Sequence, residues 1–299
     1  MRAVVIHGYG DTDVLEPAEM PVPECASGEV LIKVHAAAVN PADGKWRSGK
    51  YQAFIPLTMP HILGYDIAGT VEAGEGFSKG TRVAAMLNPM TKGGYAQYAS
   101  AVVSSVAEIP DGMSFETAAA VPCANLTGVQ LIETALDLKA GQRVLITGAL
   151  GNVGRAAMFA ARGRGAHIIA AVRADRAVEA REAGAAEIAV IGEEWTGEAF
   201  DEVADTIGGP SVAPLMRHLK PGGRIATASD SPIPPDGLPV VPEFYGINPD
   251  GAQLTKILAA VAAGALPVMI DRVLPLDAAA EGQKAVDAGG LRGKIILKP

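Results

Sequence analysis

The spacing of the hydrophobic residues changes near residue 112. Before this point, short apolar runs of strand type are separated by turns that contain Pro or Gly, such as Pro21-Val22-Pro23 and Gly93-Gly94. After it, apolar residues recur at the i, i+3, i+4 spacing of a helix, between compact apolar runs. The pattern predicts a β-rich first region followed by alternating helices and strands. The strands expected in the first region are 1–6, 30–34, 69–73 and 82–86.

The second region repeats a strand–helix pattern. Residues 114–138 are rich in Ala and Leu and predict helices, and Pro221-Gly222-Gly223 is expected to end a later helix. Because strands that alternate with helices in this way pair in parallel through right-handed crossovers, the pattern predicts a doubly wound α/β domain. Its strands are expected at 142–146, 167–172, 187–191, 203–207 and 224–228, and its other helices at 153–160, 175–184 and 212–219.

The end of the chain is expected to return to the first region. Asn248-Pro249 is expected to cap and start a helix, and strand-like runs follow at 272–274 and 294–297. We therefore expect a discontinuous first domain, residues 1–115 and 247–299, around a second domain at residues 116–246.

Composition and charge restrict the kind of protein further. The 299 residues are 49% hydrophobic and 19% charged, which is a globular mixture, and the net charge of −8 argues against nucleic-acid and anionic-membrane partners. The apolar run after Met1 is too short for a signal peptide, and no apolar stretch has the length of a membrane span. Two cysteines far apart, Cys25 and Cys123, are typical of a reducing compartment, so we expect a cytoplasmic protein.

A glycine-rich turn between an expected strand and an expected helix predicts a dinucleotide site. Gly151 would let the backbone approach a pyrophosphate at the helix N-terminus, and Gly154 would let the helix lie close to the strand. Ala149 replaces the first glycine of the usual pattern, and the alternative is a purely structural turn. The residues expected to contact the cofactor here are Gly148, Leu150, Gly151, Asn152 and Val153.

The end of the second strand of this domain indicates which dinucleotide binds. An NAD site usually has an acidic residue there for the ribose hydroxyl, whereas this chain has Arg173 and, three residues on, Arg176. Guanidinium groups at this place favour a 2′-phosphate and therefore NADPH. Asp175 could be the ribose acid, but its position suits a helix N-cap better. The alternative for Arg173 is an ordinary solvated surface charge.

Taken together, the motifs resemble those of the medium-chain dehydrogenase/reductase superfamily, in its quinone oxidoreductase-like branch, over nearly the whole chain. The resemblance implies a β-rich, GroES-like catalytic domain with an inserted Rossmann domain, a cofactor in the cleft between them, and a homodimer built through the Rossmann sheets. The motifs that carry it are Pro21-Val22-Pro23, Ser27-Gly28-Glu29-Val30-Leu31-Ile32-Lys33-Val34, Asn40-Pro41-Ala42-Asp43, Leu63-Gly64-Tyr65-Asp66, Gly93-Gly94-Tyr95-Ala96, Ile109-Pro110-Asp111-Gly112, Leu126-Thr127-Gly128, Leu219-Lys220-Pro221-Gly222-Gly223 and Arg292-Gly293-Lys294.

The resemblance also bears on zinc. Zinc-dependent relatives have a Cys at or near the position of Asn40, a His in the Gly64-Tyr65-Asp66 motif and a four-Cys lobe. A catalytic zinc needs about three Cys, His or carboxylate ligands, and here no Cys lies between Cys25 and Cys123. His61 has no thiolate partners nearby in sequence. We expect no bound metal.

Without a metal, hydride addition to a conjugated acceptor is the easier chemistry, because a quinone or enone carries the incoming charge on its own oxygen. By resemblance, Asn40 would position the nicotinamide or the acceptor carbonyl, and Tyr51 would donate a hydrogen bond or a proton; the alternatives are an ordinary turn residue and a wall of the cleft. Thr127 would lie near the nicotinamide-side phosphate or ribose. Phe244 and Tyr245 would cover the nicotinamide.

The sequence thus favours an NADPH-dependent reductase of a quinone or an α,β-unsaturated carbonyl. An enoyl-thioester reductase of the same superfamily is one alternative; it would need a cationic entrance, for which the cleft loops offer Lys45, Arg47 and Lys50. A non-catalytic NADPH-binding redox sensor is another, since fold by itself does not fix function.

Overall fold

The computed structural model describes all 299 residues and divides them into two compact units. The first unit comprises Met1–Cys123 and Pro249–Pro299, and the second comprises Ala124–Asn248. The divisions expected from the sequence were after residues 115 and 246. Each unit has its own sheet and its own hydrophobic core. No helix combines the length and the apolar character needed to cross a membrane.

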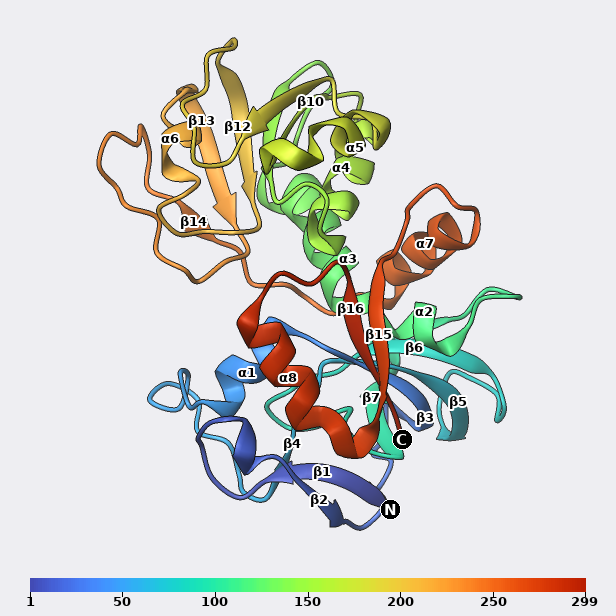
Figure 1. Ribbon diagram of the computed structural model, residues 1–299. Helices are drawn as coiled ribbons and strands as arrows, with labels where there is room; N and C mark the ends of the chain where they lie inside the picture. The colour runs from blue at the N-terminus through green and yellow to red at the C-terminus, as the bar shows by residue number, and fades with distance from the viewer. The chain divides into compact units, whose positions relative to one another are not determined.

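The first unit is built on β-sheets, as the short apolar runs predicted (Figure 1). Its main sheet has the order β15-β16-β3-β5-β6-β8, with β7 paired to β3, and a small second sheet has the order β2-β1-β4. The C-terminal strands enter the main sheet because β16 pairs antiparallel with β3. The strands are β1 (Arg2–Ile6), β2 (Glu16–Glu19), β3 (Glu29–Val39), β4 (His61–Ile62), β5 (Asp66–Gly74), β6 (Arg82–Met86), β7 (Tyr98–Val102), β8 (Val106–Glu108), β15 (Ile270–Pro275) and β16 (Lys294–Lys298).

Four helices belong to the first unit, and two of them were not expected. The unexpected ones are α1 (Pro41–Arg47) and α8 (Ala279–Ala288). Both are short and carry few apolar residues at helical spacing, which hides them in the sequence. The other two are α2 (Phe115–Ala119) and α7 (Gly251–Ala262).

The expected start of α7 at Asn248-Pro249 is wrong by two residues. Asp250 is the N-cap, and its carboxylate accepts a hydrogen bond from the backbone N–H of Gln253 at 2.9 Å. An Asp side chain is one of the strongest N-cap acceptors, so the helix begins where this bond can form.

The second unit is the doubly wound α/β domain that the pattern predicted. Its parallel sheet has the order β11-β10-β9-β12-β13-β14, which is the 3-2-1-4-5-6 order of a dinucleotide-binding fold. Helix α4 packs on β9 and β10, and α5 packs on β10 and β11. The strands are β9 (Arg143–Thr147), β10 (His167–Val172), β11 (Glu187–Val190), β12 (Phe200–Asp205), β13 (Leu219–Thr227) and β14 (Glu243–Phe244); the helices are α4 (Asn152–Gly163), α5 (Ala177–Glu182) and α6 (Ala213–Met216).

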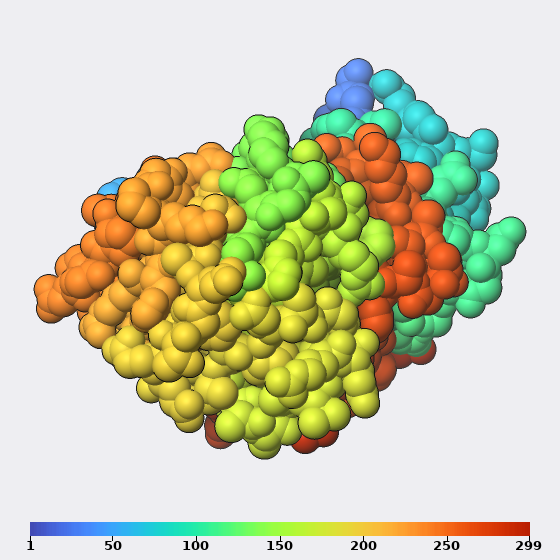
Figure 2. Space-filling model, turned by 90° about the horizontal axis from the view of Figure 1, so that it is seen from above, coloured from blue at the N-terminus to red at the C-terminus, as the bar shows by residue number.

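Helix α3 (Pro122–Gln130) precedes this sheet and continues as a π-helical turn, Leu131–Ala135. The division between the two units falls within α3, after Cys123. In the view of Figure 2 the segments of the second unit, coloured from green to orange, form one continuous surface.

Two local predictions in the second unit are wrong, and one short strand was missed. Strand β13 begins at Leu219 and runs through Pro221-Gly222-Gly223, because an irregularity in its pairing with β12 accommodates a proline that has no N–H to donate. Asp175 is not a helix N-cap: it lies in a 3₁₀ turn, Ala174–Arg176, and Arg176 caps α5. The two-residue strand β14 was not expected.

Candidate functional site

The glycine turn joins the central strand β9 to helix α4. Gly148 has a φ of +60°, a conformation that side chains with a Cβ rarely adopt. A Cβ on Gly154 would lie 2.2 Å from the carbonyl oxygen of Gly148, so glycine is required where the helix meets the turn. By contrast, a Cβ on Gly151 would approach no atom closer than 3.4 Å. Gly151 is exposed and is the N-cap of α4, whose first-turn N–H groups point out of the helix end.

A buried carboxylate, Asp205, supports this turn from the neighbouring strand β12. It accepts hydrogen bonds from the hydroxyls of Thr147 and Thr227, both at 2.6 Å, and from the N–H of Gly208 at 3.0 Å. Thr206 adds a hydroxyl bond to the Thr147 carbonyl at 2.8 Å. The carboxyl ends of β9, β12 and β13 are therefore held together at the point where a dinucleotide binds in this fold. Asp205 was not singled out from the sequence, although a lone Asp in the middle of the predicted strand 203–207 could have suggested it.

Thr127 lies in α3 and is buried, 8% exposed. The next residue, Gly128, contacts the start of α4: a Cβ there would lie 2.2 Å from the Val153 carbonyl oxygen. The structure therefore places Thr127 close to the helix that follows the glycine turn.

Phe244 and Tyr245 stand at the edge of the parallel sheet, at the end of β14. The Phe244 ring is 62% exposed. The N–H of Tyr245 donates to the Thr227 carbonyl at 2.9 Å, and its hydroxyl lies 3.4 Å from the Gln130 side-chain oxygen. Tyr245 therefore lies beside the end of β13, next to the carboxyl ends that Asp205 joins.

The two predicted arginines differ in their surroundings. Arg173 follows β10, is 66% exposed, and lies 3.5 Å from the carboxylate of the equally exposed Asp175. Arg176 is 20% exposed and pairs with Glu179 at 2.5 Å. The same carboxylate binds Arg155 of α4 at 2.7 Å. Arg155 and Glu179 were not singled out in the sequence, because their meeting depends on how α4 and α5 pack.

In the first unit, Asn40 connects β3 to α1 and is 3% exposed. Its backbone N–H donates to the Asp43 carboxylate at 2.8 Å, and its side-chain amide donates to Asp66 at 3.0 Å. The amide oxygen accepts from the ammonium of Lys294. Both ends of the Asn40 amide are therefore used in contacts within the unit.

Two buried carboxylates and one ammonium surround Asn40. Burial raises the pKa of Asp43 to about 7, although the Tyr95 hydroxyl donates to it at 2.7 Å. Burial also raises the pKa of Asp66, and Lys294 at 3.7 Å opposes that shift. The second oxygen of Asp43 is buried without a hydrogen-bond partner. Two acids next to one base make it favourable for a proton to remain in the cluster.

Tyr51 and Tyr65 both contact Trp46 of α1. The rings of Tyr51 and Trp46 meet edge to face, with centroids 4.9 Å apart. The Trp46 indole N–H donates to the Tyr65 hydroxyl at 2.7 Å, so the oxygen of Tyr65 accepts and its own O–H remains a donor. Burial raises the pKa of the Tyr65 phenol. Tyr65 belongs to a motif that the sequence showed, but no role was predicted for it.

The His, Cys, Asp and Glu side chains of the chain form no group of three or more that could hold a metal ion. His61, the histidine considered for zinc, uses its Nε2 on the Pro89 carbonyl at 2.7 Å. Cys25 and Cys123 form no disulfide.

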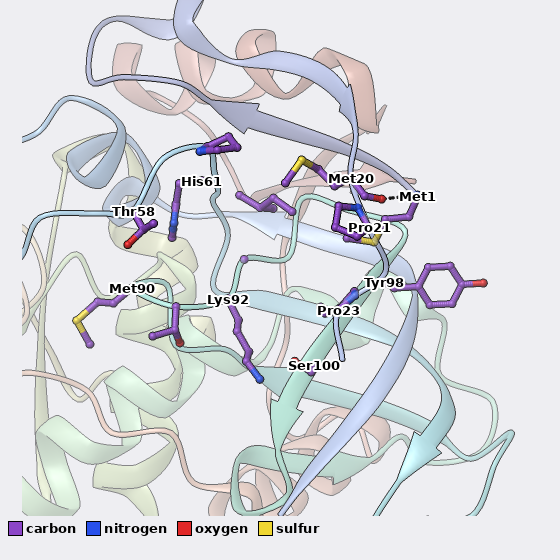
Figure 3. A pocket seen from close by; sticks show the side chains of 15 residues that line it. Met1, Met20, Pro21, Pro23, Thr58, His61, Met90, Lys92, Tyr98 and Ser100 are labelled. Atoms are coloured by element: carbon purple, nitrogen blue, oxygen red, sulfur yellow. Dashed lines mark hydrogen bonds between the residues drawn. The ribbon is translucent and has the colours of Figure 1, made fainter. Parts of the chain in front are cut away.

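A pocket of about 430 Å³ lies elsewhere in the first unit (Figure 3). Met1, Met20 and Met90 contribute apolar walls, and Lys92 and His61 contribute polar groups. Lys92 is already paired with Glu29, and His61 with the Pro89 carbonyl. None of the predicted site residues lines this pocket.

Comparison with known proteins agrees with this architecture. Residues 26–111 match the family model described as an alcohol dehydrogenase GroES-like domain, and residues 165–297 match the one described as a zinc-binding dehydrogenase. A quinone oxidoreductase from Sus scrofa is 30% identical over 99% of this chain and 97% of its own length. The chain therefore belongs to the medium-chain dehydrogenase/reductase superfamily, in its quinone oxidoreductase-like branch.

Two further similarities concern the cofactor. A chloroplastic NADPH-dependent alkenal/one oxidoreductase from Arabidopsis thaliana is 28% identical over 100% of this chain and 80% of its own length. A solved structure of an NAD-dependent alcohol dehydrogenase is 30% identical with a TM-score of 0.86, each chain being covered completely. The first of these proteins is described as NADPH-dependent and the second as NAD-dependent. The comparisons support an oxidoreductase with a dinucleotide-binding domain and a small-molecule substrate.

Proposed function

We propose that this protein is an NADPH-dependent, metal-independent oxidoreductase that reduces a quinone or an α,β-unsaturated carbonyl. The observation that carries the proposal is the glycine turn at the carboxyl end of the central strand of a 3-2-1-4-5-6 sheet. Quinone and alkenal/one oxidoreductases among the relatives support the acceptor class.

The fit of a dinucleotide rests on the space and the donors at this turn. The open position at Gly151 and the N–H groups of α4 suit a pyrophosphate, and Gly148, Leu150, Asn152 and Val153 complete the turn. Thr127, Phe244 and Tyr245 are proposed to contact the nicotinamide half. Arg173 and Arg176, which follow β10, favour a ligand with a 2′-phosphate.

A bound nicotinamide supplies a hydride, and the chain supplies orientation and hydrogen bonds. We propose that the Tyr51 hydroxyl donates to the acceptor oxygen, with Trp46 fixing its ring. Since both ends of the Asn40 amide are used internally, we propose that Asn40 acts by positioning the start of α1, which carries Trp46. Exclusion of water strengthens each of these hydrogen bonds.

The enoyl-thioester alternative is weakened by Arg47. Its side chain is 4% exposed, and its guanidinium binds Asp287 at 2.7 Å, Gln283 at 2.6 Å and the Gly10 carbonyl at 2.9 Å. A side chain held in this way does not provide a cationic entrance for a thioester carrier. The redox-sensor alternative differs from an enzyme only in turnover.

The test is oxidation of NADPH, followed by nicotinamide absorbance, against a panel of quinones, enones and enoyl thioesters. We expect turnover that prefers NADPH to NADH and that resists a chelator. Tyr51→Phe should lower kcat about tenfold to a hundredfold. Tyr98→Phe is the control, because Tyr98 lies in β7 and has no role in the proposed reaction. Tight NADPH binding without turnover of any acceptor would instead support a sensor.

We also infer a homodimer joined through the parallel sheets. Strand β14 is the edge of its sheet, and Val241, which precedes this strand, is 79% exposed. An exposed apolar edge strand is a template for pairing with another chain. Analytical ultracentrifugation should give a dimer, and Val241→Asp should shift it toward monomer.

A further inference from the structure

Three charged side chains from two elements meet beside the glycine turn. Arg155 comes from the first turn of α4, Arg176 is the N-cap of α5, and Glu179 lies in the first turn of α5. One carboxylate oxygen of Glu179 is 2.7 Å from Arg155, and the other is 2.5 Å from Arg176. Glu179 therefore holds the two guanidinium groups close to each other.

The cluster is attached directly to the proposed cofactor site. The Nε of Arg155 donates to the carbonyl of Leu150 at 3.1 Å, and Leu150 belongs to the glycine turn. The side chain of Arg155 is only 10% exposed, so this attachment is largely shielded from water. A ligand that binds along the turn toward the end of β10 therefore meets a fixed pair of arginines.

The charges of the cluster do not cancel. Two guanidiniums face one carboxylate, and each guanidinium uses its Nε and Nη2 groups, which leaves its Nη1 group for a ligand. A phosphate monoester offers three acceptor oxygens and close to two negative charges, whereas a ribose hydroxyl offers one neutral oxygen. The cluster can therefore form more hydrogen bonds and a stronger electrostatic attraction with a phosphate than with a hydroxyl.

We propose that Glu179 is a specificity-determining residue: it orders Arg155 and Arg176 as a binding site for the adenosine 2′-phosphate and competes with that phosphate for them. This inference rests on the proposed NADPH assignment and extends it to residues that do not follow β10 directly. Glu179 fixes the positions of both arginines, and its negative charge also limits how strongly they attract a second anion. Removing that charge while keeping the side chain's size therefore strengthens binding of the phosphate.

The experiment compares two adenosine ligands by isothermal titration calorimetry. Adenosine 2′,5′-bisphosphate carries the 2′-phosphate and 5′-AMP lacks it, so the ratio of their Kd values isolates the effect of that group. Glu179→Gln should shift this ratio about tenfold in favour of the bisphosphate, because one opposing charge within a few ångströms is lost. The matched control is Glu182→Gln, the same change at an exposed position one turn further along α5, which should leave the ratio within about twofold of the original.

A second variant covers the case in which Glu179→Gln disturbs the fold. Arg155→Lys keeps a positive charge but cannot bind Leu150 and Glu179 through one planar group, so it should shift the ratio against the bisphosphate. An unchanged or reversed ratio in Glu179→Gln, or an unchanged ratio in Arg155→Lys, would overturn the inference. Preference of the unaltered enzyme for NADH in turnover would overturn the NADPH assignment alone, since the ratio is measured without catalysis.

Discussion

We expect the buried carboxyl of Asp43 to make the folded protein less stable as the pH rises. Burial raises its pKa from the ordinary value of 3.8 to about 7, and its second oxygen has no partner. The folded chain therefore favours the protonated form. Protonated Asp43 therefore adds to the unfolding free energy. This contribution is complete below the pKa that Asp43 has in the unfolded chain, and it is lost as the pH rises through its pKa in the folded chain.

Because one pKa unit is worth about 1.4 kcal/mol, the rise in the pKa of Asp43 corresponds to about 4 kcal/mol of unfolding free energy in total. Integration of the proton linkage between about pH 5 and pH 8 gives a loss of about 2–3 kcal/mol over that interval. Asp43→Asn mimics the protonated acid and keeps an oxygen that accepts from the Asn40 N–H and the Tyr95 hydroxyl. The variant should therefore lack this part of the pH dependence.

Urea unfolding at several pH values measures the effect as the difference between the two proteins. From about pH 5 to pH 8, the unaltered protein should lose about 2–3 kcal/mol more unfolding free energy than Asp43→Asn. Tyr95→Phe is a second readout: it removes a donor that lowers the pKa of Asp43, so the midpoint of the pH effect should move upward. Parallel curves for the unaltered protein and Asp43→Asn would refute the reasoning, because they would mean that Asp43 ionises alike in the folded and unfolded chains.

Two further predictions concern the two units separately. Lys294→Met leaves the Asp66 carboxylate buried without its ammonium partner, so the unfolding free energy should fall by about 3–5 kcal/mol in urea titrations; a loss below about 1 kcal/mol would contradict an ion pair at this place. Gly154→Ala forces a Cβ to within 2.2 Å of the Gly148 carbonyl, so NADPH should bind at least about tenfold more weakly in fluorescence titrations. Gly163→Ala, in the same helix with no atom within 4 Å of the added Cβ, should leave that affinity unchanged; equal losses in both variants would point to a general effect on α4.

The sequence by itself determined the parts that depend on local spacing. The alternation of strands and helices gave the doubly wound sheet, and strands β6 and β10 begin and end at the predicted residues. The turn from Gly148 to Gly154 could be predicted because its glycines and the start of the following helix lie within seven consecutive residues. In these cases the pattern follows from backbone geometry and side-chain periodicity over a few residues.

Boundaries that depend on pairing between strands or on a single cap were less predictable. Pro221-Gly222-Gly223 is a typical sequence for the end of a helix. In the structure it lies inside β13, because the pairing of β13 with β12 is irregular there. Asp250 rather than Asn248 caps α7 because only its carboxylate reaches the Gln253 N–H. A sequence pattern contains the candidates for such roles but not the geometry that selects one of them.

Only the tertiary structure decided which charged side chains meet. Asn40 and Lys294 are 254 positions apart and touch because β16 pairs with β3. Arg155 and Glu179 meet because α4 and α5 both pack on β10. Contacts of this kind depend on the packing of whole elements, whereas periodicity reports only the face on which each residue lies. The sequence thus determined the fold and the glycine turn, and the three-dimensional packing determined the charge clusters around them.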